Sequence, residues 1–330
     1  MPSICRRCRS KPAEVRLPYA RMSLCPDCFR RYFEDRIRRT VEEFKMFKPQ
    51  DTVGVAVSGG KDSAALLHGL RQAFPGLKLV ALHVDLGIKK YSEHCLEKVR
   101  ALTRGLEVEL HVFDLKRELG FSIDDFRLTP YRRKICAPCG TIKRHLFDEL
   151  ARGAGVKVLA TGHNLDDIVG TMLTTFLAGD WSQLVRLKPV LPPLSPLQTR
   201  KVKPLLRSPE WEDLLYAAYS DLPFRDIGCP HAGGTRVRRN QELLEALSRR
   251  NPAFRHQTLN NFLRLIPILE KHVDQPPLTT CRRCGYPSSA EVCAYCRRVE
   301  LVRNTLEKRR QRSKLNPLLR GINRDQANDI

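Results

Sequence analysis

Two groups of four cysteines lie near the ends of the 330-residue chain, and their spacing is that of metal ligands. The first group consists of Cys5, Cys8, Cys25 and Cys28, and the second consists of Cys281, Cys284, Cys293 and Cys296. In each group a short segment separates two Cys-x-x-Cys pairs, as in zinc ribbons, where four thiolates bind one tetrahedral Zn²⁺. We therefore predict two Zn²⁺ sites. Four thiolate ligands leave no open coordination position, so both sites are expected to be structural.

Four further cysteines lie between these groups, and three of them are candidates for chemistry. Cys136 and Cys139 form another Cys-x-x-Cys pair, and Cys229 follows ninety residues later in the sequence Gly-Cys-Pro-His. Three soft ligands suit a [4Fe–4S] cluster with one iron left free, although structural clusters normally take four. A redox dithiol or a third zinc fits the same residues. The fourth cysteine, Cys95, lies in a helical pattern and is expected to be a small buried residue.

A glycine-containing loop provides a candidate anion site. It consists of Ser58, Gly59, Gly60, Lys61, Asp62 and Ser63, between the apolar run VGVAV and a helical pattern. Glycines let the backbone approach phosphate oxygens, lysine adds a positive charge, and a helix N-terminus favours anions. Asp62 can hold Mg²⁺. The loop is not a Walker A motif, which would need glycine in place of Val55. A plain turn between strand and helix is the alternative interpretation.

The patterns around this loop predict the elements that position it. Predicted strands span 52–57, 77–84, 108–113 and 156–161, and predicted helices span 36–47, 63–74, 91–106, 141–154 and 166–178. This alternation predicts an α/β fold with a parallel sheet covered on both faces, in which ligands bind at the carboxyl ends of the strands. The proline-rich stretch 188–209 is expected to be an extended surface arm, followed by helices at 210–221, 237–249 and 252–272.

The charge of the chain points to a polyanionic partner. Lys and Arg number 58 against 36 Asp and Glu, which gives a net charge of +22. Three basic runs are candidate phosphate contacts: Arg6, Arg7, Arg9 and Lys11; Arg132, Arg133 and Lys134; and Arg236, Arg238 and Arg239. Aromatic residues make up only 7% of the chain, which fits recognition of RNA shape plus one everted base. The sequence contains neither a long apolar run nor a signal peptide, so we expect a cytoplasmic protein without membrane segments.

The SGGKDS loop, in its strand and helix setting, resembles that of the PP-loop ATP pyrophosphatases. The resemblance implies a Rossmann-like fold of the adenine nucleotide α-hydrolase type, which binds ATP, cleaves it between the α and β phosphates and transfers AMP to an oxygen. It also implies that His83 and Asp85, at the end of the second strand, border the adenosine. A half-buried strand residue is the alternative for His83. Gly162 and His163, in the sequence TGHNLDD, are further candidates for nucleotide contacts, although a loop histidine is as often structural.

The order of the motifs resembles the TtuA branch of the tRNA 2-thiolation enzymes, from Cys5 to Cys296. These motifs are a zinc ribbon, SGGKDS, CAPCG, TGHNLDD and a late single cysteine. The resemblance implies that ATP activates the C2 carbonyl of a tRNA uridine, which sulfur then attacks. It implies an oxygen-sensitive [4Fe–4S] cluster on Cys136, Cys139 and Cys229. It further implies a ubiquitin-like protein with a C-terminal thiocarboxylate as the sulfur donor.

Two further residues carry over from the resemblance as catalytic candidates beside Lys61 and Asp62. The resemblance implies that Asp167 is the catalytic acid or base and that Lys143 acts together with it. Lys143 also lies four residues after Cys139, on the same helical face, where it can neutralise charge on the α-phosphate or on AMP. A solvated surface lysine is the alternative.

The resemblance divides the chain into five parts. These are an N-terminal Cys₄ zinc ribbon at 1–35, a PP-loop catalytic domain at 36–225, a helical extension with the third cluster cysteine at 226–275, a second zinc ribbon at 276–300 and a mobile basic tail at 301–330. A homodimer is left open.

The sequence around the third cysteine bears on which uridine is modified. Residues 222–232, LPFRDIGCPHA, resemble the T-loop branch, which acts on 5-methyluridine 54, and thiolases of the wobble uridine 34 are the alternative. Two other classes of protein compete with a thiolase. A PP-loop ligase that adds ammonia to a small molecule has no need of three unpaired cysteines, and an RNA-binding scaffold with an inactive loop has no need of intact Lys61, Asp62 and Ser63.

Overall fold

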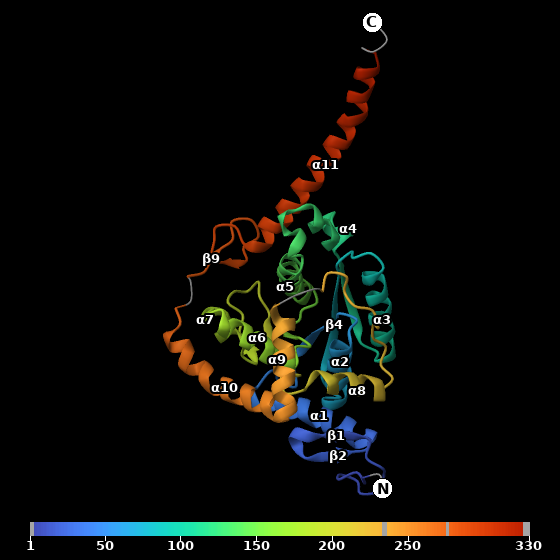
Figure 1. The fold of residues 1–330 in the computed structure, drawn as a ribbon, viewed down its shortest axis with the longest axis vertical. Helices are drawn as coiled ribbons and strands as arrows, with labels where there is room; N and C mark the ends of the chain where they lie inside the picture. The colour runs from blue at the N-terminus through green and yellow to red at the C-terminus, as the bar shows by residue number, and fades with distance from the viewer. Residues whose placement is uncertain (1–2, 233–235, 275–276, 326–330) are drawn as a thin grey trace.

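The fold is described by a computed structural model that covers residues 3–232, 236–274 and 277–325, without the side chains of 236–239, 241 and 314–325. A six-stranded sheet forms its centre, in the order β5-β4-β3-β6-β8-β7 (Figure 1). The strands are β3 (Thr52–Ala56), β4 (Lys78–Asp85), β5 (Glu109–Asp114), β6 (Val158–Ala160), β7 (Val190–Leu191) and β8 (Arg200–Val202). All neighbours pair in parallel except β7 and β8. The predicted α/β fold with its parallel sheet is confirmed.

The order of the strands indicates which edge of the sheet binds ligands. β3 lies between β4, which follows it in the chain, and β6, which comes much later. The crossovers from β3 therefore leave in opposite directions, and ligands of open α/β sheets bind at such a switch point, beyond the carboxyl ends of the strands. The loop that begins at Val57 follows β3 directly at this position.

Helices cover both faces of the sheet because side chains alternate along its buried strands. Val53 and Val55 of β3 pack in one core with α1 (Pro26–Glu43), α2 (Lys61–Ala73), α3 (Tyr91–Gly105) and α8 (Glu210–Tyr219). Val80 and Leu82 of β4 point the other way and pack against α5 (Cys136–Gly153).

A second helical layer packs beside this sheet. It contains α6 (Leu165–Leu177), α7 (Trp181–Leu184), α9 (Arg236–Arg250) and α10 (Phe254–His272), and the short α4 (Leu115–Leu119) lies after β5. Leu165 and Ile168 of α6 share a buried cluster with Leu244 of α9 and Leu259 of α10. Across the described part of the chain, every helix is too short or too polar to span a bilayer.

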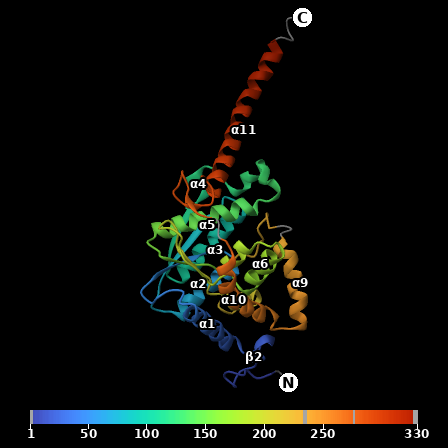
Figure 2. The same ribbon diagram turned by 90° about the vertical axis from the view of Figure 1, so that its left-hand side faces the viewer.

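Each four-cysteine group is built around a small hairpin that is followed by a helix. The N-terminal hairpin is β1 (Val15–Leu17) with β2 (Met22–Leu24), and α1 follows it. The C-terminal hairpin is β9 (Thr279–Thr280) with β10 (Pro287–Ser288), and α11 (Ala294–Asp325) follows it and projects from the body (Figures 1 and 2).

Three expectations from the sequence need correction. Cys136 is the first residue of α5 rather than part of a preceding loop, because Pro138 is tolerated in a first helical turn. The arm 188–209 contributes β7 and β8 to the sheet edge, where neighbouring prolines are tolerated. The basic tail is not an isolated segment but continues α11, since residues 307–312 include mostly strong helix formers.

Candidate active site

The glycine loop after β3 has a conformation and a contact that both require glycine. Gly59 has a φ of +78°, in the left-handed region. A Cβ atom built on it would lie 2.8 Å from the carbonyl oxygen of Cys95. Cys95 is buried, as expected, and it packs the loop against α3.

The remaining residues of the loop are tied to one another at the start of α2. The Oγ atom of Ser63 accepts from the amide of Ser58 at 3.1 Å and donates to the carbonyl of Gly60 at 2.9 Å. Gly162, after β6, approaches the same turn, because a Cβ on it would lie 3.3 Å from the amide nitrogen of Ser63. The loop therefore meets the helix N-terminus at the switch point, where amide groups and the helix dipole favour an anion.

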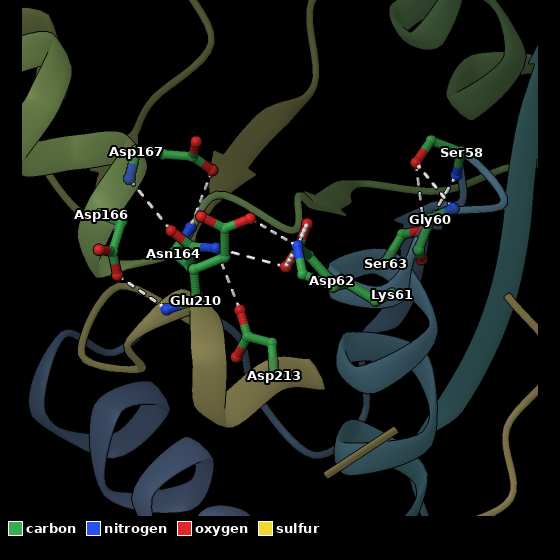
Figure 3. A network of polar contacts seen from close by, with 10 residues as sticks. All are labelled: Ser58, Gly60, Lys61, Asp62, Ser63, Asn164, Asp166, Asp167, Glu210 and Asp213. Atoms are coloured by element: carbon green, nitrogen blue, oxygen red, sulfur yellow. Dashed lines mark hydrogen bonds and ion pairs between the residues drawn. The ribbon is translucent and has the colours of Figure 1, made fainter. Parts of the chain in front are cut away.

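Asn164 links the phosphate loop to two other carboxyl groups (Figure 3). It caps α6, since its side-chain oxygen accepts from the amide of Asp167 at 3.0 Å, and the Asp167 carboxylate lies 3.3 Å from the amide of Asn164. Its Nδ2 group lies 3.4 Å from Asp62 and 3.2 Å from Asp213. One amide side chain thus fixes Asp62, Asp167 and Asp213 relative to one another.

Asp167 has a shifted acidity in this cluster. Its pKa is raised to about 7, mainly by burial and also by the nearby charges of Asp62, Glu210 and Asp166, while the hydrogen bond from Asn164 opposes the shift. A carboxyl group with this pKa exchanges a proton readily near neutral pH, which is the property of a general acid or base.

Asp213 is a buried carboxyl group that the sequence analysis missed. It is fully buried on α8, and its Oδ1 atom has no hydrogen-bond partner among the described residues. Burial, with the charge of Asp62 next, raises the pKa of Asp213 well above its ordinary value. Burial and the neighbouring carboxylate thus favour the protonated form of Asp213, in which it does not repel Asp62.

Lys61 is held by carboxylates on both sides. Its Nζ lies 2.7 Å from Glu210 and 3.1 Å from Asp62. Burial opposes its charge, but the two carboxylates raise the pKa of Lys61 above its ordinary value. Asp166, in turn, accepts from the amide of Glu210 at 2.7 Å. Lys61 is thus a fixed positive charge beside the loop, in reach of a phosphate group.

The other predicted nucleotide residues lie at the same edge of the sheet. His83 is buried, with its Nδ1 2.7 Å from the carbonyl of Val57, and burial lowers its pKa. Asp85 ends β4 and accepts from the amide of Gly87 at 2.9 Å. His163 is exposed, with its Nδ1 2.8 Å from the hydroxyl of Thr161.

The fold brings Cys136, Cys139 and Cys229 into one neighbourhood at the start of α5. Cys139 and Cys229 border one apolar cluster, and the Sγ atom of Cys136 lies 3.4 Å from the carbonyl of His231. Cys136 is exposed, and the other two are half-buried. Among the described residues, these three sulfurs do not form a compact group within 4.8 Å, the spacing that both four-cysteine groups have. A single tetrahedral Zn²⁺ holds its sulfurs about 4 Å apart.

A segment that we call the strap, residues 225–231, joins the cysteines to the phosphate loop. Its first residue, Arg225, donates its amide to the carbonyl of Gly59 at 2.7 Å. At its middle, Asp226 lies 3.0 Å from His94 of α3. At its end, His231 lies 2.7 Å from Asp124. The position of Cys229 is therefore fixed relative to the loop by three long-range contacts.

Lys143 lies on α5, one turn after Cys139, as the spacing predicted. Its side chain is half-buried, and no carboxylate of the described residues lies within ion-pair distance of it. The charge of Lys143 acts on both Cys139 and His163, so Lys143 lies near the cysteines and near the TGHNLDD loop. A lysine in this place is available to an anionic ligand.

The two four-cysteine groups have the geometry of metal sites. In each group, the four sulfur atoms all lie within 4.8 Å of one another. The N-terminal group is joined to α8 through Tyr19 and through Arg36 of α1, which contact the buried Glu212 at 2.6 and 2.7 Å. The C-terminal group is joined through Tyr286, whose hydroxyl donates to the buried Asp148 at 2.6 Å.

The predicted basic runs differ in how far the structure describes them. Arg132, Arg133 and Lys134 are exposed immediately before Cys136, and Arg6, Arg7, Arg9 and Lys11 are exposed on the N-terminal group. The side chains of Arg236, Arg238 and Arg239 lie outside the described residues.

Most of the chain matches known protein families. Residues 31–225 match the PP-loop domain model, and residues 4–30 match the N-terminal LIM domain of the 2-thiouridine synthetase TtuA. The tRNA-5-methyluridine(54) 2-sulfurtransferase of Thermus thermophilus is 35% identical over 308 residues, covering 93% of this chain and 94% of the relative. The enzyme of the same name from Pyrococcus horikoshii is 32% identical over 293 residues, covering 89% and 92%. The chain belongs to the PP-loop family of tRNA 2-sulfurtransferases.

A solved structure agrees with this sulfurtransferase family. The U34-tRNA thiolase NcsA from Methanococcus maripaludis, solved with its [4Fe-4S] cluster, has a TM-score of 0.77 and 25% identity over 90% of this chain and 95% of that chain. The family and its fold, expected from the motifs, are thereby confirmed. The matches favour thiolation over the ammonia-adding ligase and the inactive scaffold.

Proposed function

We propose that this chain is an ATP-dependent tRNA-uridine 2-sulfurtransferase that acts on 5-methyluridine 54 in the cytoplasm. The observation that carries the proposal is the strap: it ties a phosphate loop to a set of three unpaired cysteines at one edge of the sheet. Activation by ATP and delivery of sulfur are thus held at a fixed separation. Position 54 is supported by relatives named for that uridine, and the U34 thiolase structure keeps position 34 as the alternative.

The chemistry of the reaction explains why both the phosphate loop and the three cysteines are needed. Oxide is too poor a leaving group to depart from the C2 carbonyl of uridine. Attack of the C2 oxygen on the α-phosphorus of ATP releases pyrophosphate and leaves the oxygen bound to AMP. Sulfur then attacks C2, and the bond from C2 to oxygen breaks as AMP leaves. Holding the reactants together replaces a diffusional encounter.

The residues around the phosphate loop have roles in the first step. The loop amides and Lys61 bind the phosphates, while Asp62 provides a ligand for Mg²⁺. Asp167, with its pKa near 7, accepts the proton from N3 of the uridine as the C2 oxygen attacks. His83, Asp85, Gly162 and His163 border the nucleotide. Lys143 neutralises charge on the α-phosphate and on departing AMP.

The three cysteines have the donor set and the exposure that an iron–sulfur cluster requires. Their thiolates are soft ligands, and Cys136 is open to solvent while Cys139 and Cys229 are half-buried. A [4Fe–4S] cluster bound by these three thiolates would supply one iron without a protein ligand as a binding site for sulfur. The strap and α5 position the thiolates beside the loop.

The four-cysteine groups are proposed to hold one Zn²⁺ each, because four sulfurs within 4.8 Å suit a tetrahedral ion. We also propose the division at 1–35, 36–225, 226–275, 276–300 and 301–330, with α1 and α11 running across two of the boundaries. The sulfur donor is proposed to be a ubiquitin-like protein with a thiocarboxylate, and a homodimer is the proposed assembly if the chain associates.

The proposed function is tested with anaerobic protein, ATP, sulfide and an unmodified tRNA transcript. We expect pyrophosphate release that depends on tRNA, together with 2-thiouridine in the product. A second transcript that lacks a uridine at position 54 should give neither. Pyrophosphate release that proceeds without tRNA and consumes ammonia would instead identify a ligase. Product from the second transcript would move the site to position 34.

A further inference from the structure

One stretch in the middle of α11 is polar on every side. Residues 307–313, EKRRQRS, contain four cations and one acid, and all seven side chains are exposed. No carboxylate of the described residues lies within ion-pair distance of Lys308, Arg309, Arg310 or Arg312. Elsewhere exposed cations are often paired, as Arg283 is with Glu300 at 2.8 Å. We call residues 307–313 the basic arm.

The inner half of α11 anchors this arm on the core that holds the cysteines. Val302 is fully buried in the cluster that also contacts Cys139 and Cys229. The guanidinium group of Arg303 donates twice to the carbonyl of Leu119, at 3.0 and 2.9 Å. Because the anchor and the cysteines share one core, the arm has a defined direction relative to the cysteines.

The arm leaves the body with its cations beyond the anchor. α11 projects from the rest of the chain in both views (Figures 1 and 2). The four cations begin six residues after Val302 and end ten residues after it, which is about 9–15 Å along the helix axis. Cations on this projecting part of the helix are accessible to a macromolecule that is bound at the cysteines.

The side chains of the basic arm indicate whether it binds a protein or a nucleic acid. A helix that docks in a protein groove presents an apolar stripe, and residues 307–313 have no apolar side chain. Unpaired, closely spaced Arg and Lys side chains suit phosphate groups, which arginine binds through two parallel hydrogen bonds. The charge therefore favours a nucleic-acid backbone.

We propose that the basic arm of α11 binds the phosphate backbone of the tRNA and holds it against the cysteine edge of the sheet. This inference rests on the proposed function, because it takes tRNA as the substrate. The contact is with phosphates, so it contributes affinity and orientation without reading the base sequence.

The test is a four-residue variant, Lys308→Gln, Arg309→Gln, Arg310→Gln and Arg312→Gln. Glutamine retains helix propensity, so circular dichroism should be unchanged. Affinity for a tRNA transcript should fall about tenfold or more at 100 mM salt, and the slope of log K against log salt should become shallower by about 0.9 for each phosphate that the variant no longer neutralises. The KM for tRNA should rise, while kcat at saturating tRNA and the KM for ATP stay unchanged.

The matched control removes the same charge from the opposite edge of the sheet. Lys48, Arg71, Lys78 and Arg104 lie near the amino ends of strands or the last turns of α2 and α3. Their replacement by glutamine should leave tRNA affinity within about twofold of wild type. Equal losses in both variants would mean that only net charge matters, and would overturn the proposal.

Three further outcomes separate this inference from the proposed function. If wild type binds and thiolates tRNA but the arm variant does so equally well, the arm is not an RNA contact and the proposed function stands. If the arm variant binds tRNA normally but loses transfer from a thiocarboxylated carrier, the arm docks a protein and the proposal is wrong. If wild-type protein does not bind tRNA, the proposed function itself fails.

Discussion

The two kinds of cysteine site in this chain differ in how their ligands are held. In the four-cysteine groups, the sulfurs lie within 4.8 Å of one another and come from residues close in sequence, around one hairpin and the helix that follows it. Cys136 and Cys229 come from segments far apart in sequence, and the strap holds Cys229 through contacts to Gly59, His94 and Asp124. Each four-cysteine site stabilises the small module around it, whereas the three-cysteine site is held at a fixed position relative to the phosphate loop.

The largest effect should come from Cys229→Ala. Loss of one of three ligands should abolish sulfur transfer, because no fourth protein ligand compensates. The four-cysteine groups are untouched, so both zinc ions should remain. 2-Thiouridine in the tRNA product is the quantity to measure. Cys95→Ala is the control, since this cysteine packs on Gly59 through its backbone and should retain the activity.

Asp167→Asn should lower the rate of thiolation by about 10²–10⁴-fold, since an amide cannot accept a proton. In wild type, the carboxylate is the active form and its pKa is about 7. The rate should therefore fall by about tenfold per pH unit below 7 and level off above it. A pH profile of single-turnover rates tests this. The fall in rate at low pH should be absent in Asp167→Asn. It should persist in Asp180→Asn, because Asp180 is the exposed N-cap of α7, where asparagine fits equally well.

Arg36→Met should destabilise the attachment of the N-terminal group. It leaves the fully buried Glu212 carboxylate without its guanidinium partner, which costs about 3–5 kcal/mol in such pairs. Chemical denaturation should show the loss as a lower midpoint. The double variant with Glu212→Gln should recover part of it. A single variant as stable as wild type would show that the ion pair does not join the two parts.

Tyr286→Phe should have the smallest effect. It removes one hydrogen bond to Asp148, which still accepts from the amide of Thr199 at 2.9 Å and from Lys201 at 2.8 Å. The expected cost is about 1 kcal/mol, with unchanged zinc content and activity. Differential scanning calorimetry and metal analysis of the same sample test both statements, and loss of zinc would show that the C-terminal site depends on this contact.

The sequence predicted the parts of the molecule that depend on local patterns. The strands 52–57 and 77–84 and the helix at 91–106 lie within two residues of β3, β4 and α3, because buried parallel strands and amphipathic helices carry their own periodicity. The glycine loop and the paired cysteines were found from spacing alone, since phosphate and tetrahedral metal impose it.

Residues that act through long-range contacts carried no such signal. Asn164 lies in the TGHNLDD motif, but its contact to Asp213 joins residues 49 positions apart in the sequence. Arg225 reaches the phosphate loop through its backbone amide, which any residue but proline provides. β7 and β8 are two and three residues long and lie among prolines, so period-two alternation could not reveal them.

Metal content tests the difference between the closed and open sites most directly. Wild type and Cys229→Ala would be purified without oxygen, reconstituted with iron and sulfide, and analysed for iron, sulfide and zinc with an absorption spectrum. Our account predicts two zinc ions in both proteins and a four-iron cluster in wild type alone. Wild type with no iron and a third zinc would contradict it, as would a variant that retains its iron.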